Sequence, residues 1–284
     1  MSHNTFGVVI LLLIIWILVF GGVKNIQTGP VDRKNETKTI STPQQSLDDL
    51  KQQLQVVENK EKESIYKGAV SLTYVNRGSK PEEEYVTLKA TGSTTKTVLV
   101  TGWTLKSLTS GTSITIPKAS YLFFANSVNS EDLVYLENGD TVYINTGYSP
   151  NGASFRVNKC SGYLSQFQTF IPYLSTNCPL PRNEDLSEIP ARTINDACLD
   201  YINSFPSCRI QTETLPQNWS YECTRFISTK INYPTCVDNH KNDKDFNSHE
   251  WRIYLKRNDV LWKQRRETIV LYDNVGKIVD TLKY

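Results

Sequence analysis

Apolar and polar side chains alternate along the closing stretch WRIYLKRNDVLWKQRRETIVLYDNVGKIVDTLKY, residues 251–284, and this pattern indicates the class of fold. Trp251, Ile253 and Leu255 alternate with polar neighbours, and TIVLY and KIVDTLKY flank a turn at 273–276 whose Asp and Gly suit a hairpin. These runs predict strands that complete a sheet. The six Arg and Lys between Arg252 and Arg266 fall mostly in the polar phase, which indicates a solvated face.

The same two-residue alternation of apolar and polar side chains is found earlier in the chain, over residues 64–159. GAVSLTYV, EYVTLKA, TVLVTGWTLKS, SITIP, YLFFA, DLVYL, DTVYI and ASFRV are separated by turn residues at 76–78, 92–93, 110–111 and 138–140. In the first run, the period places Val70, Leu72 and Tyr74 on one face. Many short strands at close spacing predict a mainly β fold, an antiparallel sandwich or barrel, and nothing indicates a βαβ unit. Trp103, Trp251 and Trp262 are expected to pack in its core.

Residues 160–249 break this rhythm and carry helical patterns. Apolar residues recur at spacings of three and four over 194–205 and over 219–227, with Asn218 placed to cap the second helix. A third helical face runs from Tyr163 to Leu174 and is expected to end near Pro172. The pattern predicts a small helical insertion within the β domain.

All six cysteines fall in or at the edge of this insertion. They are Cys160, Cys178, Cys198, Cys208, Cys223 and Cys236. An even, clustered set is typical of disulfides, which persist outside the cytosol and would hold short helices together. Six cysteines allow 15 pairings, and the sequence does not choose among them. No Cys-x-x-Cys pair is present, which disfavours a structural zinc site.

The N-terminus carries a long apolar run. After a short tail at residues 1–5, residues 6–23 contain no charge and match the length of a membrane-spanning helix. A cleaved signal peptide is the alternative, but no Lys or Arg precedes the run. Basic residues at 24, 33, 34 and 38 favour a cytoplasmic C-terminal side, whereas the cysteines favour the opposite. We follow the cysteines and expect a single-pass membrane protein with an extracytoplasmic C-terminal domain.

Between this helix and the β domain, the pattern predicts a linker at 24–45 and a short helical stalk at 46–63. Leu47, Leu50, Leu54 and Val57 form a heptad-like stripe. Two heptads are too short to hold a coiled coil alone. The stalk is therefore interpreted as a spacer, with self-association as the alternative.

Three segments together resemble the lamin-tail domain, an immunoglobulin-like β-sandwich. They are EYVTLKATGSTTKTVLVTGWTLKS with its Gly-Trp-x-Leu, LENGDTVYINTGYSPNGASFRVNKCSGYL with its Gly-Asp-x-Val-x-Ile, and LWKQRRETIVLYDNVGKIVDTLKY with its Leu-x-Asp-x-x-Gly. The resemblance covers 64–284, interrupted by the Cys-rich insertion at 160–249, and is closest to membrane-anchored bacterial relatives. It implies a binding or scaffolding module without catalysis. The long rod of nuclear lamins has no counterpart here, so nuclear roles are not carried over.

One stretch of the sequence, VDNHKNDKDFNSHEW, groups side chains of the types that form catalytic or metal sites. His240 and His249 lie there with Asp238, Asp243, Asp245 and Glu250, which are residue types that bind metals. The spacing matches neither an EF-hand loop nor a His-Glu-x-x-His helix, so a hydrated loop is the preferred interpretation. We therefore predict no catalytic, cofactor-binding or metal-binding residue.

Composition limits the classes of function further. Lys and Arg number 31 against 29 Asp and Glu, which gives a net charge of +2 and no electrostatic case for nucleic acid. The prediction is a non-catalytic, membrane-anchored binding or scaffolding protein whose partner is a protein or an envelope polymer, with no cofactor. Two alternatives are a cell-envelope hydrolase or metal-dependent enzyme with its site in the insertion, and a DNA binder that uses Arg252 to Arg266.

Overall fold

The computed structural model describes residues 48, 50–55, 61–91, 97–124, 128–187, 189–190 and 196–284. The chain divides into two compact units, Met1–Lys51 and Gln52–Tyr284. The predicted membrane helix at 6–23 and the linker at 24–45 lie outside the described residues. Among the residues that are described, no helix has the length and apolar character needed to cross a bilayer.

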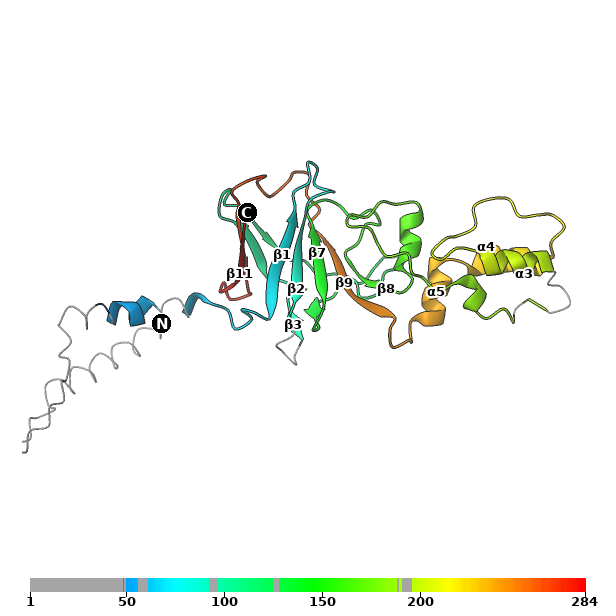
Figure 1. The fold of residues 1–284 in the computed structure, drawn as a ribbon, viewed down its shortest axis with the longest axis horizontal. Coiled ribbons are helices and arrows are strands. Elements are labelled where there is room, and N and C mark those ends of the chain that lie inside the picture. Colours follow the sequence, from blue (N-terminus) through cyan, green and yellow to red (C-terminus); the bar gives the residue numbers. More distant parts are fainter. Residues whose placement is uncertain are drawn as a thin grey trace, which may run out of the picture. The chain divides into compact units, whose positions relative to one another are not determined.

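Strands dominate the second unit, which confirms a mainly β fold (Figure 1). One sheet has five strands in the order β1 (Val70–Asn76), β2 (Tyr85–Ala90), β7 (Thr141–Asn145), β9 (Asn247–Tyr254) and β8 (Phe155–Asn158). A second sheet has four, in the order β11 (Ile278–Lys283), β10 (Thr268–Tyr272), β4 (Thr104–Ser107) and β5 (Ser113–Thr115). The short strands β3 (Val98–Leu99) and β6 (Tyr135–Leu136) pair with each other.

One strand pair departs from the antiparallel pattern that the sequence predicts. β9 runs parallel to β7, with Val142 opposite Trp251 and Ile144 opposite Ile253, and it lies between β7 and β8. A parallel pair needs a long connection, and the chain between β7 and β9 includes β8 and the whole insertion. The expectation of a purely antiparallel arrangement was therefore wrong at this position.

A β-bulge in β1 changes which side chains face the core. The pairing of β1 with β2 shifts between Leu72 and Tyr74, so one extra residue is inserted there. Val70 and Leu72 are buried as predicted, but Tyr74 is 52% exposed and Val75 is buried in its place. Because a one-residue shift moves side chains to the opposite face, the prediction that Tyr74 shares a face with Val70 and Leu72 was wrong.

Both large sheets contribute side chains to one hydrophobic core. Its members include Val86, Leu88, Val142, Ile144, Trp251 and Ile253 from the five-stranded sheet, and Leu105, Ile269, Leu271 and Val279 from the four-stranded sheet. Trp103, Trp251 and Trp262 are all buried in this core, as predicted. The closing strands at the C-terminus therefore form one wall of the core.

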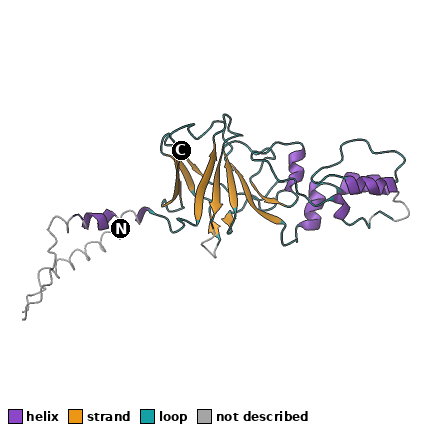
Figure 2. Cartoon of the chain, in the orientation of Figure 1, coloured by secondary structure: helices purple, strands orange, loops and turns teal. Residues whose placement is uncertain are grey.

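The chain between β8 and β9, residues 159–246, forms an inserted lobe with no strand among its described residues (Figure 2). It contains the 3-10 turns η1 (Ser161–Gln166) and η2 (Pro181–Asn183) and the helices α3 (Asp196–Ser204), α4 (Tyr221–Lys230) and α5 (Tyr233–His240). Its core includes Tyr163, Ile202, Phe226 and Val237, and extends to Phe155 and Val157 of β8 and Tyr254 of β9. The lobe therefore packs on that edge of the five-stranded sheet.

Several details of the lobe and its surroundings differ from the sequence predictions. Ser220, not Asn218, caps α4, because its hydroxyl accepts a hydrogen bond from the amide of Cys223. The helix expected from Tyr163 is only η1, which ends before Phe167. The periodicity did not reveal α5, which Asn232 caps. The described part of YLFFA forms no strand.

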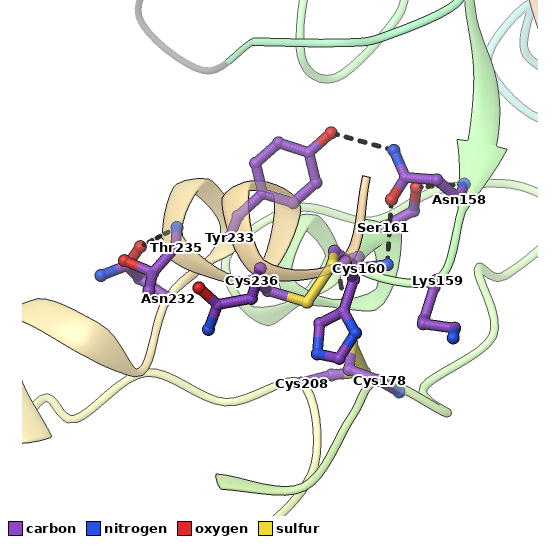
Figure 3. Close-up of a disulfide and its surroundings, with 12 residues drawn as sticks. Asn158, Lys159, Cys160, Ser161, Cys178, Cys208, Asn232, Tyr233, Thr235 and Cys236 are labelled. Atoms are coloured by element: carbon purple, nitrogen blue, oxygen red, sulfur yellow. Dashed lines mark hydrogen bonds between the residues drawn. A yellow bond between two sulfur atoms is a disulfide. The ribbon is translucent and has the colours of Figure 1, made fainter. Parts of the chain in front are cut away.

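Three disulfides hold the lobe together, as the cysteine pattern predicts. Their pairing, which the sequence leaves open, is Cys160–Cys236, Cys178–Cys208 and Cys198–Cys223. The first joins the end of β8 to α5 (Figure 3). Beside it, the side-chain amide of Asn158 donates to the hydroxyl of Tyr233 at 3.3 Å. The junction between sheet and lobe is thus fixed by a covalent bond and a buried hydrogen bond.

The predicted stalk is described only in part. Residues 48, 50–55 and 61–62 are helical, and Leu50 and Leu54 of the stripe are both 58% exposed. Leu47 and Val57, the other members of the stripe, lie outside the described residues. Self-association of the stalk stays a prediction.

Candidate functional site

The outer face of the five-stranded sheet is covered on one side and open on the other. The lobe covers β8 and β9, where Phe155 and Tyr254 join its core. On the neighbouring strands, Tyr74, Tyr85 and Tyr143 are exposed or partly exposed. The open half of this face is therefore bounded by a wall that the insertion supplies.

These three side chains, which we call the tyrosine strip, cross β1, β2 and β7. The ring centroids of Tyr74 and Tyr85 lie 6.0 Å apart, and those of Tyr85 and Tyr143 lie 5.6 Å apart. Burial, with smaller contributions from the two neighbouring phenols, raises the pKa of Tyr85 above its usual 10.0. Its hydroxyl is therefore neutral at physiological pH. The bulge in β1 is what brings Tyr74 onto this face and completes the strip.

Arg252 lies at the end of the tyrosine strip that is next to the lobe. Its guanidinium carbon lies 4.6 Å from the ring centroid of Tyr143, within the range of a cation–π contact. Arg252 is 1% exposed and pairs with Glu250, so the prediction of a solvated face was wrong for this residue. It also donates hydrogen bonds to the carbonyl oxygens of Pro172 and Tyr173 at 2.5 and 3.1 Å. Arg252 thereby fixes the lobe beside the strip.

The other five basic residues between Arg252 and Arg266 lie on the connection between β9 and β10. Lys256, Arg257, Lys263, Arg265 and Arg266 are all exposed, as a solvated face requires. No ion pair involving them is found among the described residues. We call residues 255–267 the basic loop.

Two buried carboxylates hold the backbone of the basic loop. Glu84 is fully buried and accepts hydrogen bonds from the amides of Leu261 and Trp262 at 2.7 and 3.0 Å. Glu267 accepts from the amide of Lys263 at 3.2 Å and from the hydroxyl of Ser107 at 2.9 Å. Burial alone would raise the pKa of Glu267, but these hydrogen bonds outweigh it and lower the pKa. The loop is therefore fixed in position although its basic side chains face solvent.

A groove lies between the end of β1 and the basic loop. Its volume is about 500 Å³, and it is lined by Tyr74, Val75, Asn76, Arg77, Gln264 and Arg265. The guanidinium of Arg77 donates to the carbonyl of Gln264 at 2.7 Å and lies 5.1 Å from the ring centroid of Tyr284. The lining includes two guanidinium groups and no carboxylate. Tyr74 belongs to both the groove and the tyrosine strip, so the two features form one continuous surface.

The histidine and acidic residues that the sequence groups together separate into two clusters. Nε2 of His240 lies in hydrogen-bond contact with the carboxylate of Glu184 at 2.9 Å and Nδ1 with that of Asp243 at 2.8 Å, and Lys159 pairs with Asp243 at 2.9 Å. Burial lowers the pKa of His240, but the two carboxylates outweigh it and raise the pKa overall. This cluster joins α5 to η2 and to the end of β8. Glu184 and Lys159 are the partners that sequence spacing did not reveal.

His249 belongs to the second cluster, at the start of β9. Its Nδ1 lies 2.7 Å from Oδ1 of Asp140, a fully buried carboxylate in the turn before β7. Glu137 completes a group of three side chains whose ligand atoms lie within 4.8 Å of one another. However, the guanidinium of Arg156 lies 3.5 Å from Glu137 and 3.9 Å from Asp140. A cation is thus already present, and the cluster forms an ion-pair network across β7, β8 and β9.

A polar cavity of about 380 Å³ lies beside His249, where the lobe meets the sheet. Lys159, Asp245 and Glu250 contribute to its lining together with His249. In the neutral tautomer that donates Nδ1–H to Asp140, Nε2 of His249 is a free acceptor. The arrangement can hydrogen-bond to a polar ligand. Asp238, the remaining residue of the predicted cluster, pairs with Lys241, three residues along the chain.

Comparison of the chain with protein-family models, with curated proteins and with solved structures finds no match in any of the three. The function must therefore be argued from the residues and their geometry.

Proposed function

We propose that this chain is a non-catalytic binding or scaffolding protein, tethered to a membrane by residues 6–23, that contacts its partner through the tyrosine strip and the adjoining groove. The single observation that carries the proposal is the row Tyr74, Tyr85 and Tyr143, left open on a sheet whose other half is covered. Tyrosine is enriched in binding surfaces because it offers a large apolar area and a polar hydroxyl at low entropic cost. A rigid sheet also holds the rings in position without a partner.

The proposal includes a lamin-tail-like immunoglobulin sandwich with an extracytoplasmic location. Support for the fold comes from the two sheets that share one core and from the three resembling segments, which form β2 to β4, β6 to β8 and β10 to β11. Support for the location comes from the three disulfides, since such bonds persist in oxidising compartments. The partner in this proposal is a protein or an envelope polymer.

Site-specific photocrosslinking tests this proposal in intact cells. A photoreactive phenylalanine derivative replaces Tyr74 or Tyr143 in the full-length chain, and Tyr221, which is 74% exposed on α4, serves as the matched control. We expect a discrete crosslinked product from the two strip positions and none from position 221. Equal labelling at all three positions, or labelling from 221 alone, would refute the assignment of the strip as the contact surface.

An enzyme with its site in the insertion is the second candidate, and one observation favours it. The buried carboxylate of Asp140 orients His249 at the rim of the polar cavity, which is how a general base is positioned. Against it, the guanidinium of Arg156 already lies beside both carboxylates of the cluster, where a metal ion would bind. Two measurements distinguish the enzyme from the binding protein. They are metal analysis of the purified full-length protein, and hydrolase assays of the wild type and His249→Gln. Retained stoichiometric metal, or turnover that the substitution abolishes, would establish the enzyme.

A further inference from the structure

We infer that the groove between β1 and the basic loop binds the anionic groups of an acidic glycan, while the sugar rings of the glycan lie along the tyrosine strip. This inference rests on the proposed binding function and names the class of its ligand. The anionic groups are carboxylates or phosphates, which share the geometry that a guanidinium recognises.

The lining of the groove matches a negatively charged ligand. Arg77 and Arg265 supply the charge, Asn76 and Gln264 supply amide groups, and the lining contains no carboxylate. Arginine presents its donors in a planar fork that binds carboxylate and phosphate through two parallel hydrogen bonds.

Arg77, one of the two charges of the groove, is held in place before any ligand arrives. Gln264 is fixed by its carbonyl, which accepts from Arg77, and Arg77 packs over the ring of Tyr284. The hydroxyl of Tyr284 in turn donates to the carbonyl of Lys263 at 3.1 Å. Glu84 and Glu267 also hold the backbone on either side, so binding requires little ordering of the loop backbone or of Arg77, which favours affinity.

A glycan fits the whole surface better than an acidic protein or nucleic acid does. The tyrosine strip extends the groove as a partly apolar row that carries hydroxyls, and sugars present apolar ring faces and hydroxyls of the same kind. The exposed basic residues number only five on the loop, and the net charge of the chain is +2, which is small for a nucleic-acid partner. The disulfides also support the extracytoplasmic location of the proposed function, where a glycan partner would be met.

Calorimetric titration of the full-length protein in detergent tests the inference with four probes. Oligogalacturonate carries a carboxylate on each sugar, a phosphorylated mannose oligosaccharide carries phosphate, maltohexaose is a neutral glycan, and an oligothymidylate is a single-stranded nucleic acid. We expect one of the two acidic glycans to bind, with weaker binding at high salt. Which of the two binds identifies the anion.

Two substitutions make the test specific. Arg265→Gln removes a charge from the groove, and we expect it to weaken binding about tenfold, the loss typical of a charge-assisted hydrogen bond. Arg257→Gln removes an exposed charge from the same loop outside the groove lining, and we expect a change within about twofold. Similar losses in the two variants would show general electrostatic attraction and overturn the groove as the site.

The other outcomes of the calorimetric titration also test the inference. Binding of maltohexaose as tight as that of the acidic glycans, tighter binding of oligothymidylate, or no binding by either acidic glycan would overturn the inference. These failures leave the proposed function standing if Tyr74 and Tyr143 still crosslink to a partner. Loss of that crosslinking together with retained glycan binding would instead overturn the proposed contact surface.

Discussion

The sheets and the inserted lobe are stabilised in different ways. The two sheets share a core that includes Trp103 and Trp251, and their strands pair over long sequence separations. The lobe has three helices of eight to ten residues, too short to be stable alone, and three disulfides. The β fold is therefore held by burial and strand pairing, whereas the lobe, which has a core of its own, also depends on covalent bonds. Each prediction below tests this difference.

Removing the Cys160–Cys236 disulfide should have the largest effect. The bond spans 76 residues, so the chain-entropy account gives a loss of about 4 kcal/mol when both cysteines become alanine. We expect hydrogen exchange to show lost protection in α3, α4 and α5, with β1, β2 and β7 still protected.

The matched control removes Cys198–Cys223, which spans only 25 residues. The same account gives a loss about 1 kcal/mol smaller. If β1, β2 and β7 lost protection together with the helices in either variant, the two regions would unfold as one and the comparison would fail.

A second substitution, Gly162→Ala, tests the packing around the Cys178–Cys208 disulfide. Gly162 lies in η1, and a Cβ atom there would collide with Sγ of Cys208 and lie 2.6 Å from the carbonyl oxygen of Ser175. We expect Gly162→Ala to destabilise the lobe by about 3 kcal/mol, the upper part of the range for overpacking. Denaturant unfolding, followed by non-reducing peptide mapping of Cys178–Cys208, measures it.

Gly111→Ala is the control for this substitution. Gly111 has a φ of +76°, and a Cβ there would meet nothing within 4 Å. Only backbone strain of about 1 kcal/mol is expected, and it should fall on the sheets. A larger loss at Gly111 than at Gly162 would contradict the tight fit of η1 against the disulfide.

A third change acts on the sheets through Asp140. Asp140→Asn weakens the contact of the buried carboxylate with His249 and leaves the mostly buried guanidinium of Arg156 with Glu137 alone. We expect a loss of about 2 kcal/mol. Because the guanidinium carbon of Arg156 lies 5.5 Å from the ring centroid of Trp251, tryptophan fluorescence during denaturation measures this loss of stability. Glu137→Gln, at a half-exposed position, should cost far less, and equal losses would contradict the buried network.

The sequence predicts the β fold well because alternation directly reports which face of a strand is buried. Trp103, Trp251 and Trp262 lie in the core as expected, and the two closing strands form the predicted hairpin. The bulge in β1 could not be predicted, because a one-residue insertion leaves the composition of the run unchanged. The parallel position of β9 could not be predicted either, because alternation carries no information about which strands are neighbours.

The candidate site was less accessible to sequence reasoning. The tyrosine strip depends on the bulge that exposes Tyr74 and on pairing across three strands, so its members are far apart in sequence. The disulfides were expected, but their pairing depends on how short helices pack. Arg252 was assigned to a solvated face because charged residues are rarely buried, and its partners, Pro172 and Tyr173, lie about 80 residues away.

The smallest predicted effect is a pair of opposite responses to pH. Glu184 and Asp243 raise the pKa of His240 above 6.5, so its contribution to the lobe is fully present below about pH 6.5 and is lost as the pH rises through the raised pKa. The pKa of Glu267 is lowered below 4.5, so its contribution to the sheets is present above about pH 4.5 and is lost as the pH falls through the lowered pKa. Each effect is expected to be about 1 kcal/mol or less.

Hydrogen exchange, corrected for its intrinsic pH dependence, measures the two responses in one sample. His240→Gln should abolish the loss in α5 at high pH, and Ser107→Ala should reduce the acid response near β10 because the hydroxyl of Ser107 no longer donates to Glu267. Neither substitution touches the other region, so each serves as the control for the other. If α5 and β10 lost protection on the same side of neutrality, or if either variant altered both regions, the sheets and the lobe would share one stability, and the tyrosine strip would depend on the lobe for its shape as well as for its boundary.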